Sequence, residues 1–153
     1  MTWHEAMQLA MEEAAQAAVN GDVPVGAVLL DSGGALVAQN HNRREVNHDP
    51  TAHAEVLVLR EAAARAGGWR VAGATLVVTL EPCAMCAGAT VLARIARLVI
   101  GTLDPKSGAV VSLYQLTQDV RLNHQVDVIT GVLQKETSEQ LRAFFRERRI
   151  KTK

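Results

Sequence analysis

Residues 75–80 read Thr-Leu-Val-Val-Thr-Leu, and this short run constrains the fold more than any other segment of the chain. The run is rich in β-branched side chains and is apolar on both of its faces, which is typical of a strand buried inside a sheet. Pro82 follows almost at once, and the small residues of segment 83–93 predict a helix that begins there. A buried strand that leads directly into a helix indicates parallel strand pairing and a sheet covered by helices.

The rest of the chain supplies the other elements of such a sheet. Apolar residues at helical or alternating spacing, with turn and helix-end signals between them, predict the order of the elements. We expect helices over 3–19, 50–65, 83–93, 112–117 and 133–149, strands over 25–30, 35–39, 75–80, 98–101 and 126–130, and a polar loop over 40–49. The sequence therefore predicts one domain, residues 1–153, with a three-layer α/β/α fold: a single mixed sheet of about five strands with helices on both faces.

Composition places the chain among ordinary globular proteins. The hydrophobic fraction is 48% and the charged fraction is 21%, so disorder is not expected. No apolar run is long enough to span a bilayer and the first residues show no signal peptide, so we expect a cytoplasmic protein with no membrane partner. Sixteen basic and sixteen acidic residues cancel, so the net charge indicates no nucleic-acid partner.

The charge is nevertheless concentrated at one end of the chain. Segment 141–153 contains six basic residues and one acidic residue, which gives it a net charge of +5. Phe144 and Phe145 stand inside this segment, although aromatic residues make up only 3% of the chain. Basic and aromatic side chains together are the groups that contact RNA loops. The alternative is a solvated helix end with one phenylalanine packed on the sheet, because cations favour the C-terminal end of a helix.

Two short motifs carry the chemistry of the sequence: His-Ala-Glu at 53–55 and Cys-Ala-Met-Cys at 83–86, each at a predicted helix start. Cys83 and Cys86 share a helix face, and a helix N-terminus stabilises thiolates. With His53 they make a three-ligand set, which in zinc enzymes leaves one position open for water. We therefore expect a catalytic Zn²⁺ ion bound by His53, Cys83 and Cys86.

Glu55 is the expected catalytic residue. Zinc lowers the pKa of its bound water, and a neighbouring glutamate can move protons between the resulting hydroxide and a substrate. Residues i and i+2 lie about 200° apart on a helix. His53 and Glu55 can therefore converge on one metal ion if the helix is just beginning, or if the longer side chain of Glu55 reaches around the helix. We expect the first arrangement.

Other interpretations of the cysteines stay open at this point. Cys83 and Cys86 could form a redox pair, or they could belong to a structural zinc site with His41, His48 or His124 as the fourth ligand. A binding module with a structural zinc ion would have no need of a carboxylate beside the metal.

The paired motifs resemble those of the cytidine-deaminase-like superfamily of zinc deaminases, in which H-x-E is followed by P-C-x-x-C. The similarity to the bacterial tRNA adenosine deaminases among them covers nearly the whole chain. It implies a homodimer, with one Zn²⁺ per subunit, that converts the wobble adenosine of a tRNA anticodon stem-loop to inosine. The substrate contacts that it implies are Asn42 to the flipped base, Asp104 and Lys106 to the anticodon backbone, and Phe144, Phe145, Arg146 and Arg149 to the flanking nucleotides.

The main alternative among enzymes is a deaminase of a free nucleobase or nucleoside, such as guanine or cytidine. Such an enzyme needs the same zinc apparatus but no basic C-terminal helix, so the basic segment and the extent of the resemblance favour RNA. A deaminase of the riboflavin pathway is disfavoured because no reductase domain follows.

Overall fold

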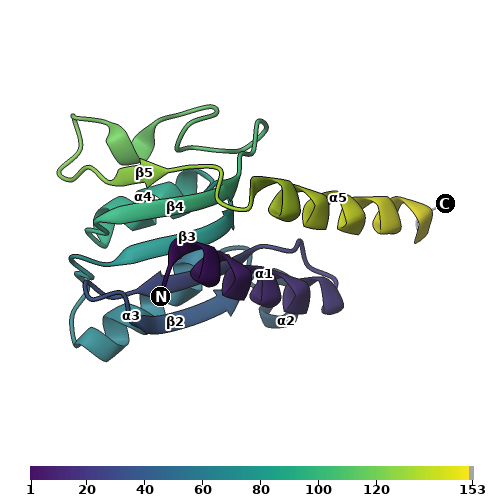
Figure 1. The fold of residues 1–153 in the computed structure, drawn as a ribbon, viewed down its shortest axis with the longest axis horizontal. Coiled ribbons are helices and arrows are strands. Elements are labelled where there is room, and N and C mark those ends of the chain that lie inside the picture. The colour runs from purple at the N-terminus through teal and green to yellow at the C-terminus, as the bar shows by residue number, and fades with distance from the viewer. Residues whose placement is uncertain (152–153) are drawn as a thin grey trace.

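The computed structural model describes residues 1–151 and confirms the predicted α/β fold. Figure 1 shows a five-stranded sheet with helices in front of it and behind it. The elements are, in chain order, α1 (Trp3–Val19), β1 (Gly26–Leu30), β2 (Leu36–His41), α2 (Arg44–Asn47), α3 (Ala54–Ala66), β3 (Thr75–Leu80), α4 (Ala84–Leu92), β4 (Arg97–Thr102), the 3₁₀ helix η1 (Leu116–Gln118), β5 (Asp127–Ile129) and α5 (Gln134–Lys151).

The sheet is mixed, as predicted, with the strand order β2-β1-β3-β4-β5. β1 runs antiparallel to both β2 and β3, whereas β3, β4 and β5 are parallel. The apolar run at 75–80 thus forms the middle strand, where both faces are covered. The carboxyl ends of β3 and β4 and the amino end of β1 meet at one edge of the sheet. Ligands of open α/β sheets bind beyond the carboxyl ends of the strands, so a binding site is expected at this end of the strands.

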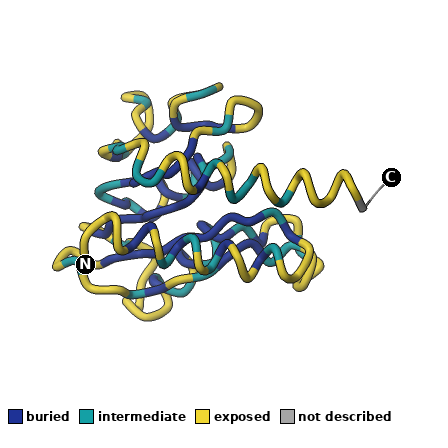
Figure 2. The backbone as a smooth tube through the Cα atoms, turned by 45° about the vertical axis from the view of Figure 1, so that its right-hand side comes forward, coloured by how far each residue is buried: buried dark blue, intermediate teal, exposed yellow. Residues whose placement is uncertain are grey.

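Alternate residues of the central strands enter two separate cores. On one face, Val28, Val77 and Val99 pack with Met7 of α1. The core on the other face is formed with α3 and α4 and includes Ala27, Leu29, Val58, Leu76, Val78, Val91, Leu98 and Ile100. Figure 2 shows the buried residues following the strands through the centre of the molecule. The two cores give the three layers that the sequence predicts.

Helix α1 lies very close to β1 because residue 26 is glycine. A Cβ atom on Gly26 would lie 1.8 Å from the carbonyl oxygen of Ala10, so any other residue would push the helix off the strand. The N–H of Gly26 also donates a hydrogen bond to Oγ1 of Thr79 at 3.2 Å. These contacts fix the start of β1 at the edge where β3 ends.

Helix α3 begins at Ala54, so the predicted start at Pro50 is wrong. Oδ1 of Asp49 accepts hydrogen bonds from the N–H and the hydroxyl group of Thr51, at 2.9 and 2.7 Å. Pro50 lies inside this side-chain turn, which delays the helix. The predicted loop over 40–49 is also wrong in part, because it contains the end of β2 and the four-residue α2.

The helix predicted over 112–117 is wrong as well, since only the single turn η1 forms nearby. The N–H and the hydroxyl group of Ser112 both donate to the carboxylate of Glu81, which holds this residue in a loop.

Helix α5 runs two residues further than predicted and projects from the body of the protein (Figure 1). Most of its length is exposed (Figure 2). Lys153, which belongs to the predicted basic segment, lies outside the described residues. Within residues 1–151, no helix combines the length and apolarity needed to cross a bilayer.

Candidate active site

The two motifs meet at the edge of the sheet where β3 ends. Nδ1 of His53 lies 3.7 Å from Sγ of Cys83 and 3.6 Å from Sγ of Cys86. All three donor atoms lie within 4.8 Å of one another. The structure therefore brings His53 to the two cysteines, which lie 30 and 33 residues further along the sequence.

The two helix starts explain this convergence. His53 is the N-cap residue of α3 and Cys83 is the N-cap residue of α4, both with extended backbone conformations. Cys86 follows in the first turn of α4, so both thiols lie near backbone N–H groups that have no partner within the helix. His53 stands just outside the helix that carries Glu55. This confirms the expectation that the helix is only beginning at these two residues.

Glu55 is almost fully buried beside this group, with 3% of its surface exposed. Its Oε1 atom has no hydrogen-bond partner among the described residues. Burial raises the pKa of the Glu55 carboxyl group, because a charge is disfavoured away from water. A buried carboxyl oxygen without a partner is costly, so the site is arranged to offer this atom to something that binds there.

The donor set fits a zinc ion. In a tetrahedral zinc site, sulfur lies about 2.3 Å and nitrogen about 2.0 Å from the metal, so a sulfur and a nitrogen ligand lie about 3.6 Å apart. The distances from Nδ1 of His53 to the two sulfur atoms, 3.7 and 3.6 Å, are close to this value. Hydrogen bonds from the Cys86 thiol and from His53 lower the pKa of Cys83, whereas the hydrogen bond to Cys83, together with burial, raises the pKa of Cys86. Zinc would bind both sulfur atoms as thiolates and would therefore displace the Cys86 proton.

A structural site would need a fourth protein ligand. Among residues 1–151, the only group of three or more histidine, cysteine or acidic side chains placed to hold an ion is His53, Cys83 and Cys86. His41 instead pairs with Glu13 at 2.8 Å, and the ring of His124 is hydrogen-bonded to the carbonyl oxygen of Ile95. The arrangement can therefore hold a metal ion with one position open, as catalytic sites do.

A cleft of about 870 Å³ opens above the candidate metal-binding group. Its lining includes His53, Glu55 and Cys83, and the walls come from α2, from the loop after β4 and from α5. The residues predicted to contact the substrate that line it are Asn42, Asp104, Lys106, Phe145, Arg146 and Arg149. The structure thus brings nearly all of the predicted site residues into one cavity.

Asn42 is buried in the cleft wall, and part of its amide group is used within the protein. Oδ1 accepts a hydrogen bond from the N–H of Ala54, and Nδ2 donates one to the carbonyl oxygen of Val23. The second hydrogen on Nδ2 has no acceptor within residues 1–151. Asn42 therefore joins β2 to the start of α3 and retains one donor for a ligand.

Phe144 does not line this cleft, although the neighbouring Phe145 does. Phe144 lies in a separate groove between α1 and α5, beside Ala15 and Ala18, and Arg148 stacks over its ring at 5.5 Å. Phe145 is 42% exposed. Of the two rings, Phe145 lines the cleft, and Phe144, which is half-buried, lines the separate groove.

Glu81 is a site residue to which sequence reasoning gave no role. Its buried carboxylate accepts hydrogen bonds from the N–H groups of Asp104, Val110, Val111 and Ser112 at 2.8 to 3.1 Å. A Cβ atom on residue 108 would strike this carboxylate, so that position is glycine. Glu81 thus ties the cleft loop to the segment that carries the cysteines, and only its place next to Pro82 could have signalled this.

Arg44 is a second cleft residue that sequence reasoning missed. It lines the cleft, and its guanidinium is paired with the buried carboxylate of Asp22 at 2.8 Å. No local motif signals a pair between residues 22 positions apart, since α1 and β2 must first be placed.

Known proteins resemble this chain over nearly its whole length. The family described as MafB19-like deaminase matches residues 1–149. The chain belongs to this deaminase family. It is 50% identical to the tRNA-specific adenosine deaminase of Bacillus subtilis over 147 residues. The aligned region covers 96% of this chain and 91% of the relative. The resemblance inferred from the paired motifs is thereby confirmed.

Solved structures support the fold of this deaminase. A structure from work on A-to-I editing by tRNA:A34 deaminases at the wobble position superposes with a TM-score of 0.86 at 44% identity, covering 90% of this chain and 99% of that chain. The guanine deaminase of Nitrosomonas europaea superposes with a TM-score of 0.79 at 22% identity, over 92% of this chain and 83% of that chain. At that identity the likeness concerns the fold alone.

Proposed function

We propose that this protein converts the wobble adenosine of a tRNA anticodon stem-loop to inosine. The observation that carries the proposal is that one cavity contains both a candidate metal site with a glutamate and a wall suited to RNA. The half-buried His53 and Cys83, with the buried Cys86 and Glu55, lie at a cleft that is also lined by cations and by the exposed ring of Phe145. The B. subtilis relative, which is half identical, is named a tRNA-specific adenosine deaminase.

We assign His53, Cys83 and Cys86 as the ligands of one Zn²⁺ ion per subunit, because their donor atoms fit a three-ligand site. The metal would supply a Lewis acid that turns a water molecule into a nucleophile near neutral pH.

Glu55 moves the protons in this proposal. Its carboxylate takes one proton from the attacking water and delivers it to N1 of the adenine ring as the new C–O bond forms at C6. It then takes the second proton from the added oxygen and delivers it to the exocyclic amine. The C–N bond breaks, ammonia leaves and the carbonyl group of inosine remains. The buried, unpartnered Oε1 of Glu55 suits a group that must reach both water and substrate.

The cleft wall would hold the RNA around the target nucleotide. The free Nδ2 hydrogen of Asn42 can donate to the flipped base, and Asp104 and Lys106 would lie against the anticodon backbone. Phe145, Arg146 and Arg149 would contact the flanking nucleotides through stacking and charge. Phe144 was also predicted to contact RNA; it lines the groove beside α1 and not this cleft, so that contact stays a prediction.

A deaminase of free guanine or cytidine is the second candidate, because it would use the same metal-binding residues. The cations and the exposed Phe145 along the cleft wall have no partner in a free base, and they favour a polynucleotide. The cytoplasmic location expected from the sequence stays a prediction.

A homodimer is part of the proposal. The outer face of α4 exposes Met85 and Leu92, and the nearby loop before η1 exposes Leu113 and Tyr114. Large apolar side chains that are exposed on neighbouring elements are typical of an interface. We expect a dimer by sedimentation at micromolar concentration, and the Leu92→Asp variant should shift it toward monomer. A wild-type monomer with full activity would contradict this part of the proposal.

The test of the function is metal removal and restoration. Zinc-loaded protein is incubated with an anticodon stem-loop that carries a wobble adenosine, and inosine is detected by mass or by sequencing. We expect inosine formation, its loss after chelation, and its recovery on addition of one equivalent of Zn²⁺. A zinc-loaded protein that forms no inosine would contradict the proposed function.

A further inference from the structure

Arg44 is held in the cleft by an anchored ion pair. Its Nε and Nη2 atoms donate hydrogen bonds to Oδ1 of Asp22 at 3.0 and 2.8 Å. The Asp22 side chain is completely buried, whereas 36% of the Arg44 side chain is exposed. Nη1 of Arg44 makes no hydrogen bond within residues 1–151. One edge of the guanidinium is therefore locked, and the rest remains available to a ligand in the cleft.

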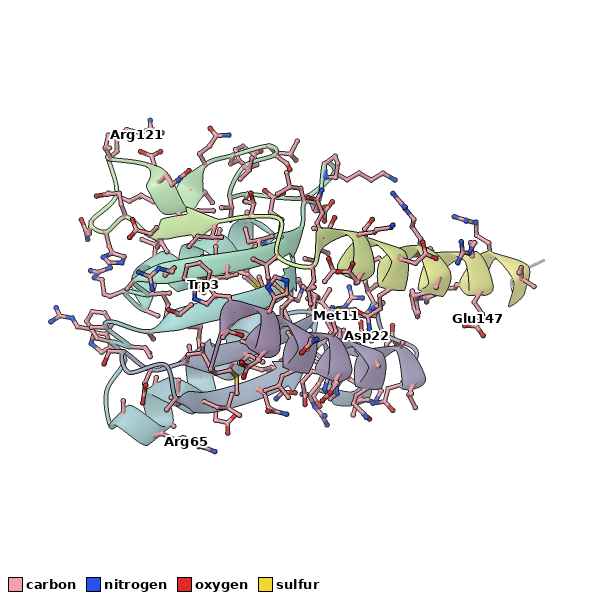
Figure 3. The ribbon with its side chains drawn as sticks, in the orientation of Figure 1. Trp3, Met11, Asp22, Arg65, Arg121 and Glu147 are labelled. Carbon is pink, nitrogen blue, oxygen red and sulfur yellow. The ribbon has the colours of Figure 1, made fainter. Side chains whose placement is uncertain are left out.

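The carboxylate of Asp22 is itself held in place by the backbone. It also accepts hydrogen bonds from the N–H groups of Val23 and Glu45, at 2.8 and 3.2 Å. Burying an ion pair typically brings little net stability, because both charges lose their hydration. Such a pair does fix geometry, and here it fixes a cation at the mouth of a cleft. Figure 3 shows Asp22 at the end of α1 that lies toward α5.

The cleft carries cations on separate walls. Lys106 comes from the loop after β4 and Arg149 from α5, whereas Arg44 comes from α2. A nucleotide within an RNA strand has a phosphate on each side, so a strand crossing the cleft must place phosphates toward more than one wall. Guanidinium groups bind phosphate through paired N–H donors, and pre-setting the group reduces the entropy lost on binding.

We propose that Arg44 binds a backbone phosphate of the RNA next to the target nucleotide and that Asp22 is its positioning residue. This inference rests on the proposed function, since it requires an RNA substrate at the same site.

The first test removes the cation. The Arg44→Gln variant should bind the anticodon stem-loop about tenfold more weakly. The slope of log K against log salt concentration should also become shallower by about 0.7, as expected for one lost phosphate contact to a single strand. The matched control is Arg65→Gln. Arg65 also forms an ion pair, with its Nη2 atom 2.8 Å from Oε1 of Glu61. Arg65 lies on α3, far from Asp22 in Figure 3, and its loss should leave both quantities unchanged.

The second test separates positioning from simple attraction. Asp22→Asn removes a negative charge, so general electrostatics alone would tighten RNA binding. If Asp22 positions Arg44, binding weakens despite the gain in positive charge. Glu61→Gln is the control for the same change of charge at a surface pair. Arg44→Lys keeps the charge but loses the paired donors, so it should retain the salt slope and still weaken binding.

The outcomes are distinct from those that test the proposed function. A wild-type protein that neither binds nor edits the stem-loop overturns both. This inference alone is overturned if the wild-type protein edits the stem-loop but Arg44→Gln and Arg65→Gln have the same affinity and the same salt slope. Tighter binding by Asp22→Asn, or unchanged binding by Arg44→Lys, overturns the positioning role. Zinc content and thermal unfolding show whether each variant is folded. If Asp22→Asn does not fold, the binding of Arg44→Lys decides the positioning role.

Discussion

The candidate metal centre and the wall of the cleft above it are built in opposite ways. His53, Cys83, Cys86 and Glu55 come from the starts of two helices packed on the sheet, and Glu55 and Cys86 are buried. The substrate-facing wall comes from α2, a loop and the projecting α5, and its cations are largely exposed. Under the proposed function, chemistry and substrate selection therefore belong to separate parts of this molecule. Changes at the centre should alter turnover, and changes at the wall should alter binding.

Loss of a metal ligand is expected to have the largest effect. Cys83→Ala leaves two protein donors, so zinc content should fall sharply and inosine formation should become undetectable. Metal analysis and the stem-loop assay measure these quantities together. Binding of the stem-loop should fall far less than activity, because the wall is intact. A variant that retains full activity with little zinc would break the assignment of the centre.

Glu55→Gln should lower kcat by about a hundredfold to ten-thousandfold, the range typical of a lost proton-transfer group. Zinc content and KM should stay near the wild-type values, because glutamine fills the same space. This variant also separates a catalytic zinc site from a structural one. Unchanged kcat would mean that the carboxylate is dispensable and that the metal has a structural role.

The two phenylalanines sharpen the comparison between binding and packing. Phe145→Ala should raise KM for the stem-loop about tenfold to a hundredfold, because stacking of a base on an aromatic ring contributes about 1–3 kcal/mol. Phe144→Ala should leave KM nearly unchanged and lower the melting temperature instead, since its half-buried ring lines the groove beside α1 and not the cleft. Steady-state kinetics and thermal unfolding distinguish the two, and the reverse pattern would contradict the orientation of α5.

Glu81 should contribute a smaller, pH-dependent effect on stability. Burial raises the pKa of its carboxyl group, but hydrogen bonds from Ser112, Val111 and Asp104 outweigh burial and hold it below the ordinary value. Because the folded-state pKa is lowered, this stability is present above about pH 4 and is lost as the pH falls through the folded-state value. Glu81→Gln should therefore be less stable than wild type at pH 7, with a difference that shrinks in acid. Denaturant unfolding at several pH values measures the difference.

The sequence predicted the centre better than the wall for physical reasons. The ligands and Glu55 lie in two contiguous motifs, and a helix start places each side chain with little help from the rest of the fold. The sheet was predictable because strand 75–80 must be covered on both faces. By contrast, the pairs formed by Asp22 with Arg44, and by Glu81 with segment 104–112, depend on how distant segments pack.

The errors have the same origin. Pro50 suits a helix start, but the Asp49 side chain forms a turn with Thr51 that delays α3. The roles of Phe144 and Phe145 depend on the rotation of α5 about its axis, which a local pattern of two adjacent aromatic residues does not fix.

The most direct test of the account compares kcat/KM for the anticodon stem-loop with kcat/KM for free adenosine, cytidine and guanine, with the same zinc-loaded protein. If the buried centre does the chemistry and the wall selects a polynucleotide, the stem-loop should be edited and the free compounds should react very slowly or not at all. Deamination of a free base or nucleoside at a rate comparable to that of the stem-loop would contradict the role of the wall, although it would leave the centre as described.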